Sequence, residues 1–316
     1  MTDDQDEVQK PGTVSGRSYS RTRPRGFAAW KPRADSALLI EMVQEVIAEH
    51  VEFGAMTKRQ IFYRLVGKHG YPKTEASYDR LLELLARAQR ARLVPMSAIR
   101  DDGPVALYNS GGYEGPAQWW ESLRSQAEHY QHDPCDGQPV TVELWVESAG
   151  MTQMVGRIAE DFGVNVFSSG GFESLTAKYQ AACRIAYADR PTQVLSVGDH
   201  DPSGLSMLDA AAEDVVAFVA ELGGEPPAFA RLAVTPAQVR RYRLETAPQK
   251  ERDKRGAHMA TTVQAEALAP EELAQVVRAG LEKALDKRAL ARARRRTESE
   301  RAEIMQAIDR LGIGEL

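Results

Sequence analysis

Two apolar runs of the sequence end in acids that could bind a metal ion together. Residues 196–204, SVGDHDPSG, carry Asp199 and Asp201 directly after the run QVLSV, and Glu147 closes the earlier run VELWVE. Side chains at the carboxyl ends of parallel strands meet at one edge of a sheet, so we expect these carboxylates to converge. Carboxylates held together raise one another's pKa values, and a hard cation such as Mg²⁺ relieves the repulsion. The alternative for Asp201 alone is a helix cap.

A second candidate for chemistry is Tyr63, in the segment TKRQIFYRLVG. Successive helical steps of about 100° place four apolar residues on one arc, which we expect to be buried: Ile61, Phe62, Leu65 and Val66. Tyr63 lies off this arc, with Arg59 one turn before it and Gly67 one turn after it. A phosphodiester could therefore approach the tyrosine hydroxyl. The open alternative is a half-exposed surface tyrosine without a role.

The segments that must position Tyr63 predict a small helical unit over residues 35–110. Three helices are expected to begin at Ser36, Thr57 and Thr74, each a residue type that caps helices, and VPMSAI with DDGPVALY is expected to form a β-hairpin. Three helices followed by a two-stranded wing predict a winged helix-turn-helix, whose third helix often enters a DNA groove. A helical module for protein contacts is the alternative.

From Val140 the pattern changes to alternating strands and helices, which predicts an α/β domain with a parallel sheet covered by helices on both faces. We expect this domain to span residues 139–316 with a C-terminal helical extension, after a linker at 111–138. Residues 1–34 are polar and rich in arginine, and predict a disordered basic arm.

Composition and charge limit the possible classes of protein. The net charge of -5 argues against a uniformly basic nucleic-acid binder, but residues 16–33 and 287–296 are dense in Lys and Arg and contain no acid. The two cysteines are too few for a disulfide framework. No apolar run approaches about 18 residues and the N-terminus is acidic, so we expect no membrane contact and a cytoplasmic, nucleoid-associated protein.

The acidic motifs have a known counterpart. VELWVES followed by SVGDHDPSG resembles a Toprim domain, over roughly residues 139–222. The resemblance implies that Glu147 is a general acid/base or metal ligand and that Asp199 and Asp201 bind Mg²⁺. It gives His200 no metal role.

The segment TKRQIFY, in a predicted winged helix that precedes this domain, resembles the catalytic-tyrosine motif of topoisomerase VI A subunits and of the related meiotic transesterase that makes double-strand breaks. The chain looks like a short relative of the phage or mobile-element kind. The resemblance implies that Tyr63 attacks DNA, that Arg59 assists, and that the product is a 5′-phosphotyrosyl bond. It departs from those A subunits at Ser148, where they commonly carry lysine.

Cutting both strands of double-stranded DNA needs two tyrosines, so a homodimer is expected. The sequence has no GxxxxGK(S/T) motif, so strand passage would need a separate ATPase subunit. Five further cations are expected to contact DNA: Lys58, Arg64, Arg87, Arg90 and Lys250. Two alternatives stay open. One is a metal-dependent Toprim nuclease that uses water, as in bacterial plasmid-defence systems, and the other is a DNA-binding module without catalysis.

Overall fold

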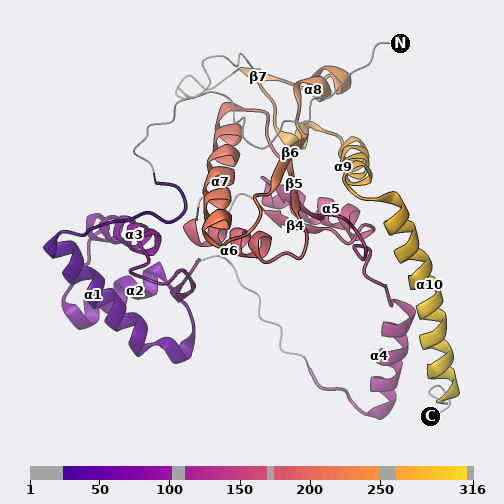
Figure 1. Ribbon diagram of the computed structural model, residues 1–316, viewed down its shortest axis with the longest axis horizontal. Helices are drawn as coiled ribbons and strands as arrows, with labels where there is room; N and C mark the ends of the chain where they lie inside the picture. Colours follow the sequence, from indigo (N-terminus) through magenta and orange to yellow (C-terminus); the bar gives the residue numbers. More distant parts are fainter. Residues whose placement is uncertain (1–23, 102–110, 169–173, 249–260, 312–316) are drawn as a thin grey trace.

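The computed structural model describes residues 24–101, 111–168, 174–248 and 261–311, which form an α/β protein (Figure 1). A parallel sheet with flanking helices occupies the middle. A helical unit lies on one side of it and an antiparallel pair of long helices projects on the other. Within the described residues, no helix combines the length and apolarity needed to cross a membrane.

The N-terminal helical unit contains α1 (Ala34–Glu49), α2 (Lys58–His69) and α3 (Glu75–Arg90). The predicted caps at Thr57 and Thr74 are confirmed. The Thr57 hydroxyl accepts from the Gln60 N–H at 3.1 Å, while the Gln60 side chain accepts from the Thr57 N–H at 2.8 Å. The predicted cap at Ser36 is wrong: α1 begins at Ala34, and Arg33 precedes it without a side-chain cap. A 3₁₀ turn at Val51–Phe53 follows the helix.

The predicted hairpin is wrong in its first half. Met96–Ala98 forms a 3₁₀ turn, because Pro95 has no N–H to give to a ladder and the Met96 side chain packs against the central domain. Strand β2 (Ile99–Arg100) instead pairs parallel with β1 (Met56–Thr57). The second half of the predicted wing, residues 102–110, lies outside the described residues.

The central sheet has four parallel strands in the order β4-β3-β5-β6. Three strands were predicted: β3 (Thr141–Val146), β4 (Asn165–Ser168) and β5 (Thr192–Val197). The fourth, β6 (Ala228–Ala233), was not, because it is a half-exposed strand at the sheet edge with no continuous apolar run.

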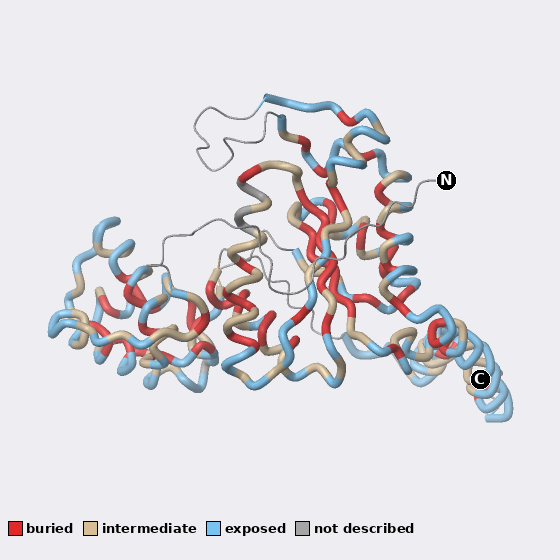
Figure 2. Tube along the Cα trace, turned by 45° about the horizontal axis from the view of Figure 1, so that its top comes forward, coloured by how far each residue is buried: buried red, intermediate tan, exposed pale blue. Residues whose placement is uncertain are grey.

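Helices cover both faces of this sheet, as predicted. One face packs on α5 (Ala149–Glu160) and α9 (Pro270–Ala284), and the other on α6 (Leu175–Ala186) and α7 (Pro202–Glu221). Figure 2 shows the buried residues concentrated in the strands and in the helix sides that face them. Beyond β6 lie α8 (Pro236–Tyr242), β7 (Ala247–Pro248) and β8 (Thr261–Thr262), the last two an antiparallel pair.

The predicted linker at 111–138 contains α4 (Pro116–Glu128), which packs antiparallel against α10 (Lys287–Arg310) in a projecting two-helix arm. A small apolar seam joins the two helices, formed by Ala127, Ile308, Trp120, Ile304 and Met305. Polar contacts fix the base of the arm: the Tyr130 hydroxyl donates to Glu300 at 2.7 Å and Arg301 donates to the Tyr130 carbonyl at 2.8 Å. Helix α4 therefore depends on a partner far along the chain, which local sequence does not reveal.

A buried ion cluster anchors the N-terminal unit to the central domain. Asp214 of α7 is fully buried, and it lies 2.9 Å from Arg90 of α3 and 3.0 Å from Lys178 of α6. The Gly26 N–H donates to the same carboxylate at 3.2 Å. Although burial alone would raise the pKa of Asp214, its hydrogen bond to Arg90 and the nearby Lys178 hold that pKa below its ordinary value.

This cluster corrects two predictions. Arg90 was expected to contact DNA, but it is committed to Asp214. The N-terminal arm was expected to be disordered through residue 34, but Phe27 stacks edge-on against Phe218 with ring centroids 5.0 Å apart. Gly26 has φ +54°, and a Cβ there would collide with Ala217, so the approach of this segment to α7 requires glycine.

Asp214→Asn is expected to lower the free energy of unfolding by about 3 kcal/mol, because it removes the buried negative charge that Arg90 and Lys178 contact. Urea unfolding followed by circular dichroism measures the loss. The control is Asp189→Asn, which removes an exposed ion pair with Arg190 and should cost under about 1 kcal/mol. Equal losses in the two variants would contradict the assigned role of the cluster.

Candidate functional site

Helix α2 presents Tyr63 to solvent, as its periodicity predicted. Tyr63 is 52% exposed, while Ile61, Phe62 and Leu65 of the opposite arc are buried. Val66, also expected to be buried, is only half-buried. The Phe62 ring supports the tyrosine edge-on, with centroids 5.6 Å apart. The hydroxyl is therefore carried on a ring whose base is fixed by the core.

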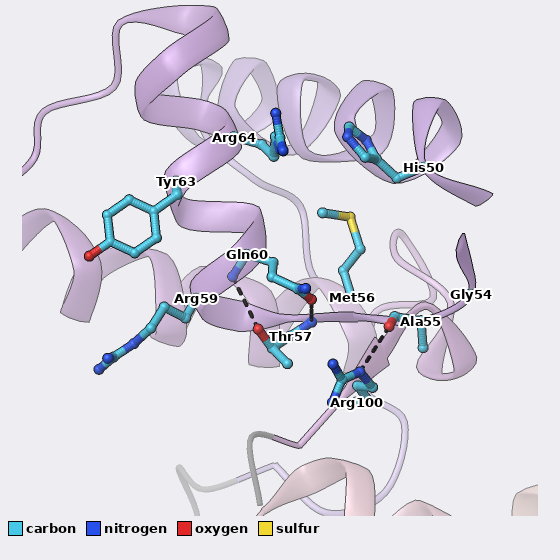
Figure 3. Close-up of a pocket in the computed structure, with 10 residues that line it drawn as sticks. All are labelled: His50, Gly54, Ala55, Met56, Thr57, Arg59, Gln60, Tyr63, Arg64 and Arg100. Atoms are coloured by element: carbon cyan, nitrogen blue, oxygen red, sulfur yellow. Dashed lines mark hydrogen bonds between the residues drawn. The ribbon is translucent and has the colours of Figure 1, made fainter. Parts of the chain in front are cut away.

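A groove of about 980 Å³ lies beside Tyr63 (Figure 3). It is lined by His50, Gly54, Ala55, Met56, Thr57, Arg59, Gln60, Tyr63, Arg64 and Arg100. The Arg59 and Tyr63 side chains extend on the same side of α2, while Arg64 and His50 lie across the groove from them. Three arginines and no acid are among these described lining residues, so the groove favours an anion such as a phosphodiester.

A second pocket of about 250 Å³ shares Tyr63 and Arg59 with the groove. Its other lining residues are Phe62, Lys73, Thr74, Glu75 and Tyr78. The Lys73 ammonium lies 5.5 Å from the centroid of the Tyr63 ring. The tyrosine therefore stands where two pockets meet, with a cation of α2 and one of the α2–α3 loop beside it.

The other four cations predicted to contact DNA differ in their surroundings. Arg64 lines the groove, whereas Lys58 is half-buried at the start of α2 and lines neither pocket. Arg87 is exposed on α3 with its guanidinium 4.4 Å from the centroid of the Trp30 ring. Lys250 lies outside the described residues.

Sequence reasoning missed Arg100, His50 and Lys73. Arg100 reaches the groove only because β2 pairs with β1, opposite Thr57, and its guanidinium donates to the Ala55 carbonyl at 3.2 Å. No local pattern signals such a pairing. The motif TKRQIFY could have directed attention to charged neighbours in its flanking loops, and Lys73 is one of them.

The acidic edge forms as predicted. Strands β3 and β5 are in parallel register, with Val146 opposite Val197, so Glu147 and Asp199 follow at the same edge. The Glu147 carboxylate accepts the Asp199 N–H at 2.9 Å, and the Asp199 carboxylate accepts the Ala265 N–H at 2.8 Å. Asp201 lies next to them, immediately before α7.

Gly198 lies between the end of β5 and Asp199, and a Cβ at this position would collide with the Glu147 carboxylate. The glycine therefore lets the carboxylate lie against the backbone of β5.

An arginine that the sequence did not reveal lies among these acids. The Arg231 guanidinium, from β6, donates to the Asp199 carbonyl and, at 3.2 Å, to the Val234 carbonyl. Burial raises the pKa of Glu147, and the charges of Asp199 and Asp201 raise it further against the opposing effect of Arg231. Burial likewise raises the pKa of Asp199. Negative charge at this edge is thus incompletely compensated.

The chemistry of these donors suits a hard cation. Carboxylates such as Glu147, Asp199 and Asp201 are the oxygen ligands that Mg²⁺ takes. In the described part of the chain, no three His, Cys, Asp or Glu side chains are arranged to hold a metal ion. Glu147 and Asp199 are bonded to backbone N–H groups instead, so metal binding would require their side chains to adjust.

Mg²⁺ is expected to stabilise the folded wild-type protein and so to raise its melting temperature. At a Mg²⁺ concentration of a hundred times the dissociation constant, the free energy of unfolding should increase by about 2.7 kcal/mol. Asp199→Asn should remove this effect, although the amide can still accept the Ala265 N–H. The pKa values of Glu147 and Asp199 are raised in the folded protein, so without metal the fold loses stability as the pH rises through them. Asp199→Asn removes one of these charges and should therefore melt no lower than wild type. Thermal melts in Mg²⁺ and in EDTA test both points, and an unchanged Mg²⁺ response in Asp199→Asn would contradict the assignment.

The two candidate half-sites do not meet in one chain. The acids lie at the N-terminal end of α7, while the N-terminal unit contacts its C-terminal half through Asp214 and Phe218. Helix α7 has 20 residues, and so is about 30 Å long. Figure 1 shows α2 beyond the C-terminal end of α7, away from the carboxyl ends of the strands.

These two half-sites, one with an exposed tyrosine among arginines and one with three carboxylates beside an arginine, define the chemistry to be explained. No protein-family model matches the chain and no curated protein matches it.

Proposed function

We propose that the protein is a DNA-cleaving transesterase that works as a homodimer, with Tyr63 of one copy acting beside the acids of the other. The observation that carries the proposal is the exposed Tyr63 hydroxyl where two pockets lined by Arg59 meet. The resemblance of TKRQIFY and DHDPSG to topoisomerase VI A subunits supports the same assignment. The protein would then act on double-stranded DNA, in the nucleoid.

The proposed step is an in-line displacement at phosphorus. The Tyr63 oxygen forms a bond to the phosphate, the bond from phosphorus to the 3′ oxygen breaks, and the phenol proton ends on that oxygen. One phosphodiester replaces another, so the step is reversible. Arg59, on the same side of α2 as Tyr63, stabilises the extra negative charge of the pentacovalent phosphate. A Mg²⁺ ion held by Glu147, Asp199 and Asp201 would neutralise charge on the phosphate and leaving oxygen.

Two features support the proposed second copy. The ion cluster at Asp214 fixes the N-terminal unit at the far end of α7 from the acids of its own chain. Cutting both strands also needs two tyrosines, and a twofold dimer supplies two equivalent mixed sites. Strand passage coupled to ATP would need a separate ATPase subunit.

The second candidate is a metal-dependent nuclease in which the acidic edge activates water and Tyr63 only contacts DNA. The separation of Tyr63 from the acids within one chain favours it, since a water nuclease needs no tyrosine at the metal. Nucleases of bacterial plasmid-defence systems are the corresponding class.

Trapping a covalent adduct separates these candidates. The purified protein is mixed with end-labelled duplex DNA and Mg²⁺, then denatured with detergent. A transesterase leaves protein linked to the 5′ end of the cut strand through Tyr63, as peptide mass analysis would identify. Cut strands without linked protein indicate the nuclease, and bound but uncut DNA indicates a binding module.

A further inference from the structure

The five arginines of the basic segment at the start of α10 divide into two sets with different surroundings. The first set fixes the two-helix arm to the domain. Arg296 lies 3.0 Å from Asp136 and 3.0 Å from Glu300, and Arg294 donates to the Asp161 carbonyl at 3.5 Å. These arginines are explained by the fold.

The second set, which we call the arginine row, is Arg288, Arg292 and Arg295. Spaced four and three residues apart, the three lie within about 60° on one face of α10. The buried residues of α10 lie on the opposite side: Ala289, Leu290, Ala293 and Ile308. All three arginines are exposed, and none forms an ion pair with any acid of the described chain.

The next residues outward on the same face are Ser299, Ala302, Glu303 and Gln306, so the first acid beyond the row is Glu303, which Ser299 contacts. A helix rises about 1.5 Å per residue, so the row extends over about 10 Å, a length along which one DNA strand presents about three phosphates. A surface usually interleaves charges of both signs, and this chain has 45 acids to 40 Lys and Arg. A face of three arginines without an acid is therefore a local departure that suits a polyanion.

We propose that the arginine row binds the phosphate backbone of duplex DNA beside the segment that is cleaved. The inference rests on the proposed action on DNA, and it adds a contact surface on the arm, on the opposite side of the sheet from α2. A membrane surface is the poorer partner, because the outward face of α10 carries no large apolar side chain to insert between lipids.

The test compares two triple variants. Arg288→Gln/Arg292→Gln/Arg295→Gln removes the row, and Arg124→Gln/Arg278→Gln/Lys287→Gln removes the same charge from cations already paired with acids. Binding to a linear DNA duplex is measured from about 50 to 200 mM salt. Loss of three phosphate contacts should reduce the slope of log affinity against log salt by about 2.7, while the control keeps the wild-type slope. Matching melting temperatures of the two variants check that both are folded.

The outcomes separate this inference from the proposed function. Three results would overturn the row: a wild-type slope in the row variant, an equal loss of slope in the control, or no duplex binding by the wild type. If the row variant loses only binding to anionic vesicles, the row binds a membrane instead. Tyr63→Phe removes no charge and should keep the full slope. If Tyr63→Phe still cuts DNA while the row variant loses slope, the proposed chemistry fails and the row stands.

Discussion

Replacing Tyr63 by phenylalanine is expected to abolish both the covalent adduct and strand cleavage, by about 10⁴-fold or more, because a transesterase without its nucleophile has no substitute at phosphorus. The substitution removes one oxygen from a ring that is 52% exposed, so the free energy of unfolding should change by less than about 0.5 kcal/mol. Affinity for DNA and the Mg²⁺ response should also persist. Cleavage of an end-labelled duplex measures the effect.

The matched control is Tyr113→Phe, since Tyr113 has a similar exposure of 50% and lies in the segment before α4. It should cleave as wild type does. If Tyr63→Phe cuts at a comparable rate, then water is the nucleophile and the plasmid-defence type of nuclease becomes the better account.

Neutralising the acidic edge is expected to be equally damaging. Asp199→Asn, Asp201→Asn and Glu147→Gln should each lower cleavage by about 10³-fold or more while DNA binding survives, because a lost ligand charge weakens the metal site more than the fold. The side-chain amides introduced by Glu147→Gln and Asp199→Asn can still accept hydrogen bonds from the N–H groups that the carboxylates bind in the wild type.

Glu266→Gln is the control for this series, because the exposed Glu266 raises the pKa of Asp199 but belongs to the turn Ala265–Ala267 and does not follow a strand of the sheet. It should retain cleavage. Activity preserved in both aspartate variants would rule out the metal site.

Much of the candidate site follows from local sequence. Glu147 and Asp199 converge because β3 and β5 are buried runs that alternate with helices, and parallel strands end at one edge. The exposure of Tyr63 follows from the 3.6-residue period of α2, in which Ile61 and Leu65 face the core.

The parts that sequence did not reveal depend on contacts distant along the chain. Arg231 reaches the acids on a half-exposed edge strand that has no strong pattern, and Arg100 reaches the groove beside Tyr63 through the pairing of β2 with β1. Arg90 looked available for DNA, and only the fold shows that a buried Asp214 engages it. Helix α4 needs α10 beside it to exclude water from its apolar side.

Mixing two inactive variants shows whether Tyr63 of one copy acts with the acids of another. Tyr63→Phe supplies intact acids and Asp199→Asn supplies an intact tyrosine. In a mixed dimer one site therefore has both the tyrosine and the intact acids, and the other site has neither. If the two copies share the site, the mixture nicks one strand of a duplex and the adduct forms only on the Asp199→Asn chain. No cleavage by the mixture, under conditions where wild type cuts and the variants are shown to pair, would contradict a shared site.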